Sequence, residues 1–267
     1  MADLDFTIHG KPGEIAAATF REAIGNAVGL LREFDSAISG KSLGSLRWYV
    51  SRLHSNGSLT VGFSSKAKKP SRAKQPHDYS PAITDTFMSG LDVLETKGIL
   101  PPYLSEQGLQ KAELLSGLIG RNGASGFRFS YAHQSVDVTS KTNENVRHLL
   151  PITRVAIGSV EGKLEAINLH HKPRFIVYHS ITKKAVTCEF NEAELLDDIK
   201  RCLGKRVVVS GELKKNVNGD TLRVKMDAIR VIGEAITKDR FADISGLGEP
   251  SFTGFETTED YLRNIRG

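Results

Sequence analysis

The chain has 267 residues, of which 39% are apolar and 25% are charged. That length and apolar content can fill one large domain or two ordinary ones. No apolar run approaches the roughly 18 residues of a membrane-spanning helix, and the N-terminal segment Met1–Phe6 carries two aspartates where a signal peptide would be basic. We therefore expect a cytoplasmic protein that has no association with a membrane.

The net charge of +5 is unevenly distributed along the chain. Residues 1–150 carry a net charge of +3, residues 151–233 carry +5, and residues 234–267 carry −3. The middle segment is thus the most basic part, and a basic patch is the electrostatic footprint of a nucleic-acid-binding surface. We predict three parts with these boundaries: two domains and a C-terminal tail.

The first 150 residues mix strand and helix patterns. Period-two alternation of apolar and polar side chains predicts strands, and apolar spacing of three and four predicts helices. Their order predicts an α+β domain with helices on one face of a sheet. The expected elements are a strand at 4–9, a helix at 13–38, strands at 46–53 and 58–63, helices at 80–97 and 105–120, and a strand at 127–131.

The middle segment predicts three strands, one helix and two further strands. Asn191 offers a helix cap, acidic residues come early and basic residues late in the following run, and Gly204 is the expected stop. Asn218-Gly219 between the last two strands is a hairpin signal. The expected elements are strands at 156–169, 174–179 and 185–190, a helix at 192–203, and strands at 206–213 and 221–232.

This order and the pattern of the last hairpin resemble the OB-fold family, whose domains are five-stranded β-barrels. The resemblance implies a face for oligonucleotides or oligosaccharides over the second and third strands. Gly162 fits the sharply coiled first strand of such a barrel. The matching hairpin residues are Gly204, Arg206, Val207, Val209, Gly211 and Leu213, followed by Gly219, Leu222, Val224 and Ile229.

Basic residues on this barrel are the first candidates for contact with phosphates and bases. Tyr178 would point outward beside Arg174 if Phe175 fills the barrel, which would pair a stacking ring with a charge. The alternative is that Tyr178 packs against the other domain. The candidate residues are Lys172, Arg174, Tyr178, Lys183, Lys184, Lys214, Lys215 and Arg223.

A second basic segment, residues 66–74, holds five bases and no acid. Flexible lysines can follow a polyanion without fixed geometry, so this loop is a candidate phosphate-contacting arm. A merely solvated loop is the alternative. The bases concerned are Lys66, Lys68, Lys69, Arg72 and Lys74.

Signals for catalysis and metal binding are missing. The chain has no nucleophile elbow, no phosphate-binding glycine loop and no Cys-x-x-Cys pair. His170 and His171 are adjacent on an extended segment, so their side chains point apart and rarely bind one ion. We expect Cys188 and Cys202 to be a reduced, buried pair, although a disulfide is possible. We predict no catalytic residues, no cofactor and no metal.

The C-terminal tail is acidic but contains apolar residues, which suggests a loop and a short helix that docks either on its own domains or on a protein partner. It loosely resembles the C-terminal arms of small bacterial antitoxins, which lay a peptide with a terminal arginine across a ribonuclease. The resemblance implies contacts by Arg263 and Arg266. The other candidate partner-binding residues are Phe252, Phe255, Tyr261 and Leu262.

Together these features predict a non-enzymatic protein that binds nucleic acid through the basic barrel face and the 66–74 loop. An antitoxin-like module that binds a protein partner, such as a ribonuclease toxin, through its tail is the alternative. An enzyme of unrecognised type is the third hypothesis, favoured only by a deep polar pocket with perturbed titratable groups.

Overall fold

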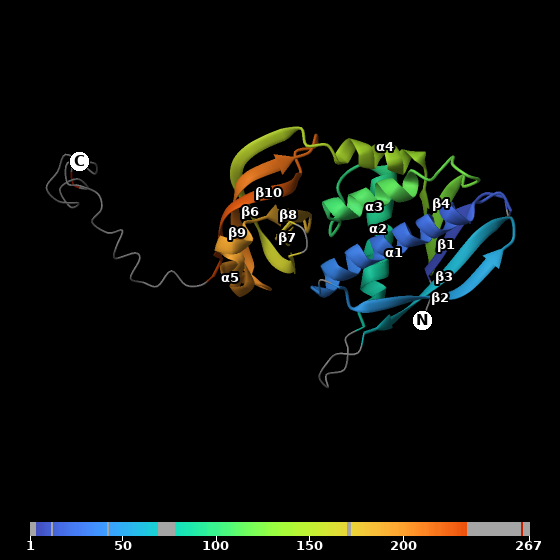
Figure 1. Ribbon diagram of the computed structural model, residues 1–267, viewed down its shortest axis with the longest axis horizontal. Coiled ribbons are helices and arrows are strands. Elements are labelled where there is room, and N and C mark those ends of the chain that lie inside the picture. Colours follow the sequence, from blue (N-terminus) through green and yellow to red (C-terminus); the bar gives the residue numbers. More distant parts are fainter. Residues whose placement is uncertain are drawn as a thin grey trace. The chain divides into compact units, whose positions relative to one another are not determined.

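A computed structural model describes residues 4–11, 13–41, 43–68, 78–169 and 172–233, together with residue 263. Residues Met1–Arg230 form one unit, and the chain from Val231 onward belongs to a second. The first unit contains two five-stranded sheets, one open and one closed into a barrel, with five helices among the described residues (Figure 1). The predicted α+β class is confirmed.

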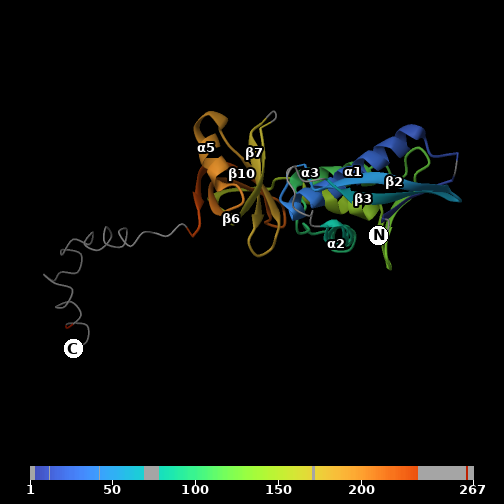
Figure 2. The same ribbon diagram turned by 90° about the horizontal axis from the view of Figure 1, so that it is seen from below.

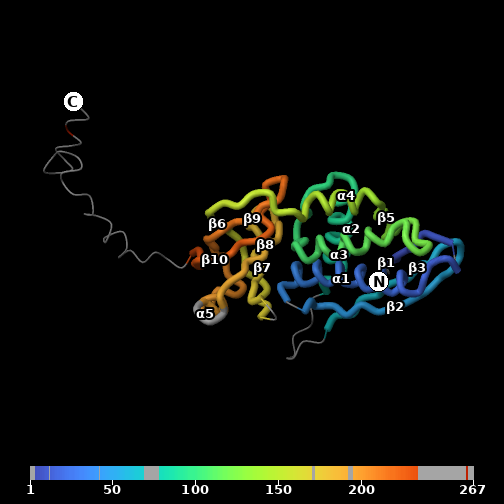
Figure 3. Tube along the Cα trace, turned by 45° about the horizontal axis from the view of Figure 1, so that its top comes forward, coloured from blue at the N-terminus to red at the C-terminus, as the bar shows by residue number. Residues whose placement is uncertain are grey.

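The open sheet is antiparallel throughout and has the strand order β2-β3-β1-β4-β5. β2 is an edge strand, visible along one side of the trace in Figure 3. Beyond its first residues most of its side chains are exposed. The strands are β1 (Leu4–His9), β2 (Leu46–Ser55), β3 (Ser58–Ala67), β4 (Gly126–Tyr131) and β5 (Gln134–Val138).

Helices cover one face of this sheet, as predicted. In β1, Leu4, Phe6 and Ile8 are buried, whereas the alternate polar residues are only half-buried. Phe6 lies 4.7 Å from Phe129 between ring centroids, and Phe129 lies 4.9 Å from Phe87 of α2. Figure 1 shows α1, α3 and α4 side by side. The helices are α1 (Ala17–Ser39), α2 (Ser80–Thr96), α3 (Glu106–Ser116) and α4 (Ser140–Leu149). In the described part of the chain no helix is long and apolar enough to cross a bilayer.

β5 and α4 were not predicted, because their sequences are polar. β5 has only five residues, and its buried side chains are Val136 and Val138. α4 buries Thr142, Val146 and Leu149, which is too few apolar residues for a strong periodic signal. Packing against neighbouring elements, more than local pattern, stabilises both.

The barrel has the predicted order of three strands, one helix and two strands, and its ring order is β10-β8-β7-β6-β9. β10 and β8 pair in parallel. Phe175, Val207 and Val224 are fully buried. α5 lies at one end of the barrel (Figure 2). The elements are β6 (Arg154–Asn168), β7 (Arg174–His179), β8 (Ala185–Glu189), α5 (Glu192–Cys202), β9 (Arg206–Lys215) and β10 (Thr221–Val231).

Two residue-level expectations in the barrel are confirmed. β6 pairs with both β7 and β9, and at Gly162 the backbone approaches the carbonyl of Tyr178 so closely that a Cβ would collide with it. Glycine is therefore required where the first strand coils. Cys188 and Cys202 are buried free thiols, and burial raises the pKa of the Cys188 thiol, which keeps it protonated.

Contacts within Met1–Arg230 join the barrel to the helical layer. Arg223 of β10 donates two hydrogen bonds to Glu106 of α3, at 2.6 and 3.1 Å, and lies 3.4 Å from Glu189 of β8. These hydrogen bonds raise the pKa of Arg223. Leu222, the residue before it, belongs to the same buried hydrophobic cluster as the core of the open sheet. We call Arg223, Glu106 and Glu189 the ion-paired seam.

Candidate functional site

A cavity of about 1080 Å³ opens between the start of β2, the C-terminal half of α1 and the barrel strand β7. We call it the groove. Its residues come from α1, the segment from Leu43 into β2, the end of β3, α3, the end of β6, and β7. They are Arg32, Glu33, Ser36, Leu43, Leu46, Arg47, Trp48, Tyr49, Lys68, Gln107, Ala166, Ile167, Asn168, Leu169, Arg174, Ile176 and Tyr178.

One wall of the groove is fixed by the buried carboxylate of Asp35 on α1. It accepts hydrogen bonds from the Ser45 backbone N–H (2.7 Å), the Ser45 hydroxyl (2.8 Å) and the Leu46 N–H (2.9 Å). Gly44 passes so close to this carboxylate, with a φ of 67°, that a side chain there would collide with it. Lys68 donates to the carbonyls of Leu43 and Gly44 from the other side. The entry to β2 is therefore held in place before any ligand arrives.

Three arginines on the groove have no carboxylate partner among the described residues. Arg32 of α1 and Arg47 of β2 are exposed, and Arg174 of β7 is half-buried. Within the described residues, none of the three side chains forms a hydrogen bond or an ion pair. Glu33 is the acid of this lining, and it accepts a 2.6 Å hydrogen bond from Ser105, the N-cap of α3. The groove therefore carries positive charge that the described protein does not neutralise.

Aromatic side chains accompany these cations. Trp48, the single tryptophan of the chain, is half-buried and packs against the core of the helical layer while also lining the groove. Its indole N–H is covered and has no acceptor among the described residues. Tyr49 and Arg47 point to the opposite face of β2 from Trp48, and the Lys66 ammonium lies 5.3 Å from the centre of the Tyr49 ring. Arginines beside aromatic rings suit a ligand that has both anionic and flat apolar parts.

Tyr178 is buried by packing, in line with the alternative that it packs against the first domain. Phe175 fills the barrel, so Tyr178 points outward, but it packs with Ala37 of α1 and with Tyr103, and only 6% of it is exposed. Its ring lies 5.9 Å from that of Tyr103. Burial and the nearby Glu33 raise the pKa of Tyr178, so the phenol stays neutral.

The predicted residues fall into two groups. Arg174, Tyr178 and Lys68 meet at the groove, although they are far apart in the sequence, and Lys66 lies nearby over Tyr49. Three other predicted cations are ion-paired, which leaves them less able to bind phosphate. These pairs are Lys184–Asp220 (2.5 Å), Lys214–Glu212 (3.8 Å) and Arg223 with Glu106 and Glu189.

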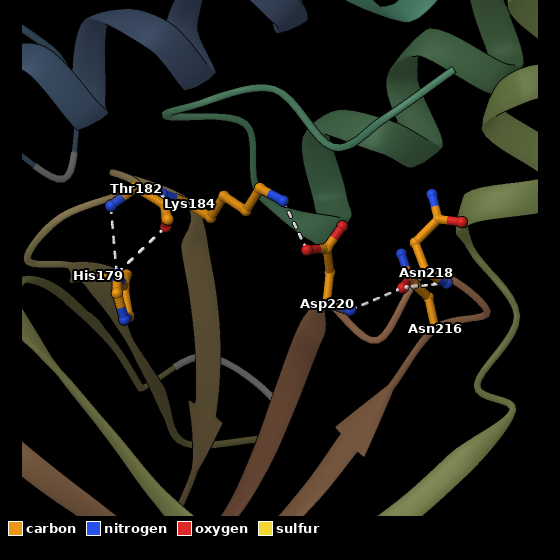
Figure 4. A network of polar contacts seen from close by, with 6 residues as sticks. All are labelled: His179, Thr182, Lys184, Asn216, Asn218 and Asp220. Carbon is orange, nitrogen blue, oxygen red and sulfur yellow. Dashed lines mark hydrogen bonds and ion pairs between the residues drawn. The ribbon is translucent and has the colours of Figure 1, made fainter. Parts of the chain in front are cut away.

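The Lys184 pair connects two turns of the barrel (Figure 4). In the first turn, His179 Nδ1 accepts a 3.2 Å hydrogen bond from the Thr182 backbone N–H. In the second, Asn216 Oδ1 accepts from the N–H groups of Asn218 and Asp220. These hydrogen bonds stabilise the two turns, so the network has a structural role. Lys183 donates to the Ser180 carbonyl, and the side chains of Lys172 and Lys215 have no hydrogen bond or ion pair with any described residue.

Several predicted residues lie outside the described part of the chain. They are Lys69, Arg72 and Lys74 of the basic loop, and Phe252, Phe255, Tyr261, Leu262 and Arg266 of the tail. Arg263 is described as an exposed helical residue.

The sequence matches no protein-family model, and a search of curated proteins finds no significant relative. Among the described residues, no three His, Cys, Asp or Glu side chains gather as metal ligands would.

Sequence reasoning missed most of the groove lining, including Arg32, Arg47, Trp48, Tyr49 and Gln107. The available signal was the run Arg47-Trp48-Tyr49, a cation followed by two aromatic residues on a strand of modest hydrophobicity. The same run also fits one strand of a hairpin, and that interpretation does not point to a binding surface. Arg32 lies on the polar side of α1 and carries no local signal.

Proposed function

We propose that this protein binds nucleic acid in the groove. The observation that carries the proposal is that Arg32, Arg47 and Arg174, from three separate elements, line one cavity without a carboxylate partner among the described residues. Most of the affinity of proteins for nucleic acids comes from such cations, which release counterions from the phosphates. Trp48 adds an aromatic surface, which a simple phosphate site does not need.

The barrel supports the same proposal. Its ring order, its parallel β8–β10 pair and its helix after the third strand support assignment to the OB-fold family that the sequence resembles. In that family the second strand belongs to the ligand-binding face. Here the second barrel strand is β7, and it contributes Arg174 and Ile176 to the groove.

The test is a fluorescence-anisotropy titration of the full-length protein with labelled oligonucleotides at two salt concentrations. The test variant carries Arg47→Glu and Arg174→Glu. The matched control carries Lys141→Glu and Arg154→Glu, which change net charge equally at exposed positions away from the groove; neither side chain is ion-paired to a described residue.

We expect wild-type binding to weaken as salt rises and the groove variant to lose at least about 100-fold in affinity, because it removes two phosphate contacts and adds repulsion. Its dependence on salt should flatten by about two units of slope. The control should bind like the wild type. Equal losses in the two variants would mean that net charge alone drives binding, and no wild-type binding at low salt would overturn the proposal.

A further inference from the structure

Charge alone does not explain the composition of the groove, and its remaining side chains bear on which form of nucleic acid enters. Trp48 lines it from β2, and Gln107 lines it from α3. This inference rests on the proposed function and makes it more specific.

An aromatic residue in the lining of the groove argues against a duplex. In a duplex the faces of the bases are hidden in the stack, so a concave protein site reaches a base only when it is unpaired or flipped out. The groove therefore fits a single nucleotide or a short unpaired segment.

Trp48 has the properties of a stacking platform. Trp48 packs against the helical core, which restricts its orientation, and it is also half-buried at the lining of the groove. Its indole N–H has no acceptor in the described part of the chain, so hydrogen bonding within the protein does not account for an indole at this position. Tyr49 is less suited because Lys66 lies over its ring.

Gln107 supplies the polar group that an edge of a base would need. Its side chain is half-buried at the groove and has no hydrogen bond to any described residue. A carboxamide both donates and accepts, so it can pair with the edge of a nucleobase. Arg47 and Arg174 line the groove from separate elements, β2 and β7, and can contact the flanking phosphates.

We infer that the groove accepts an unpaired base of a single-stranded nucleic acid, which stacks on Trp48 and meets Gln107 at its edge. Affinity should therefore depend on exposed bases as well as on phosphate charge. A duplex and a phosphate polymer lack one or both of these features.

The experiment uses the full-length protein and the emission of its single tryptophan. The probes are a single-stranded oligonucleotide, the same strand annealed to its complement, and inorganic polyphosphate. We expect the single strand to quench Trp48 emission saturably and to bind at least tenfold more tightly than the duplex. Polyphosphate should leave the emission nearly unchanged.

Two variants, followed by anisotropy, sharpen the result. Trp48→Ala should lose about tenfold to 100-fold in single-strand affinity, the range measured when a stacking aromatic is removed. Trp48→Phe keeps a ring and should retain most of the affinity. Gln107→Leu should reduce differences in affinity among homopolymers of different bases.

The outcomes separate the two proposals. If single strand and duplex bind equally and neither quenches Trp48, the single-strand inference is overturned while nucleic-acid binding stands. The same holds if polyphosphate binds as tightly as the single strand and quenches equally. If no nucleic acid binds, both proposals fail. The quenching measurement needs no variant, so poor folding of Trp48→Ala would not obscure the result.

Discussion

The groove and the ion-paired seam use the same residue type in opposite ways. In the seam, Arg223 is held between Glu106 and Glu189 and is about one-third exposed. In the groove, Arg47 and Arg174 line an open cavity and form no ion pair with a described residue; Glu189, the cross-strand neighbour of Arg174, pairs with Arg223 of the seam instead. An arginine whose charge is satisfied internally contributes to the fold, whereas one left without a partner is available to a ligand. Partner carboxylates, more than the number of cations, distinguish the two regions.

The largest expected effect comes from the support of the groove wall. Asp35→Asn removes the charge that three donors share and turns an amide N–H₂ toward one of them, leaving a buried donor unpaired. We expect the free energy of unfolding to fall by about 3 kcal/mol. Urea denaturation followed by circular dichroism measures it. Ser45→Ala, which removes only the hydroxyl, should cost about 1 kcal/mol, and equal costs would contradict this account.

The next effect contrasts the two regions directly. Arg223→Met leaves the buried carboxylate of Glu106 without its bidentate partner, so we expect a loss of about 2 kcal/mol in unfolding free energy with little change in nucleic-acid affinity. Arg174→Met, the matched change in the groove, should alter stability by less than about 0.5 kcal/mol and weaken binding about tenfold. The comparison fails if both variants lose stability alike.

The smallest effect concerns an exposed pair on the open face of the sheet. A hydrogen bond from Arg128 lowers the pKa of Asp137 below its ordinary value of 3.8. A lowered folded-state pKa stabilises the protein above about pH 4, and this contribution is lost as the pH falls through the folded value. Arg128→Gln should therefore cost less than about 1 kcal/mol at pH 7 and almost nothing near pH 2. Urea midpoints of both proteins at the two pH values test this, and an equal cost at both would contradict it.

The sequence was sufficient to predict the barrel closely, because its signals are local and agree with one another. Gly204 and the cap region of α5, the Asn218-Gly219 turn and the alternating strands all point to one order of elements. The open sheet was predicted less completely, since β5 and α4 are short and polar and depend on packing for their stability.

The site was harder to predict than the fold. Arg174 and Lys68 were selected by charge and do lie on the groove, but their meeting depends on how β3 and β7 are placed in three dimensions. Lys184 and Arg223 were selected by the same reasoning, and only the structure reveals the acids beside them. Ion pairing between residues distant in sequence leaves no local pattern. A count of charged residues therefore overestimates the number of cations that are available to a ligand.

Leu222 links the unfolding of the barrel to the unfolding of the helical layer. It stands on a barrel strand, yet it is buried in the same hydrophobic cluster as the open sheet and its helices. Separating the barrel from the helical layer would expose this side chain and break the adjacent Arg223–Glu106 pair at once. Opening either part therefore weakens the other, and the two sheets are expected to melt as a single cooperative transition.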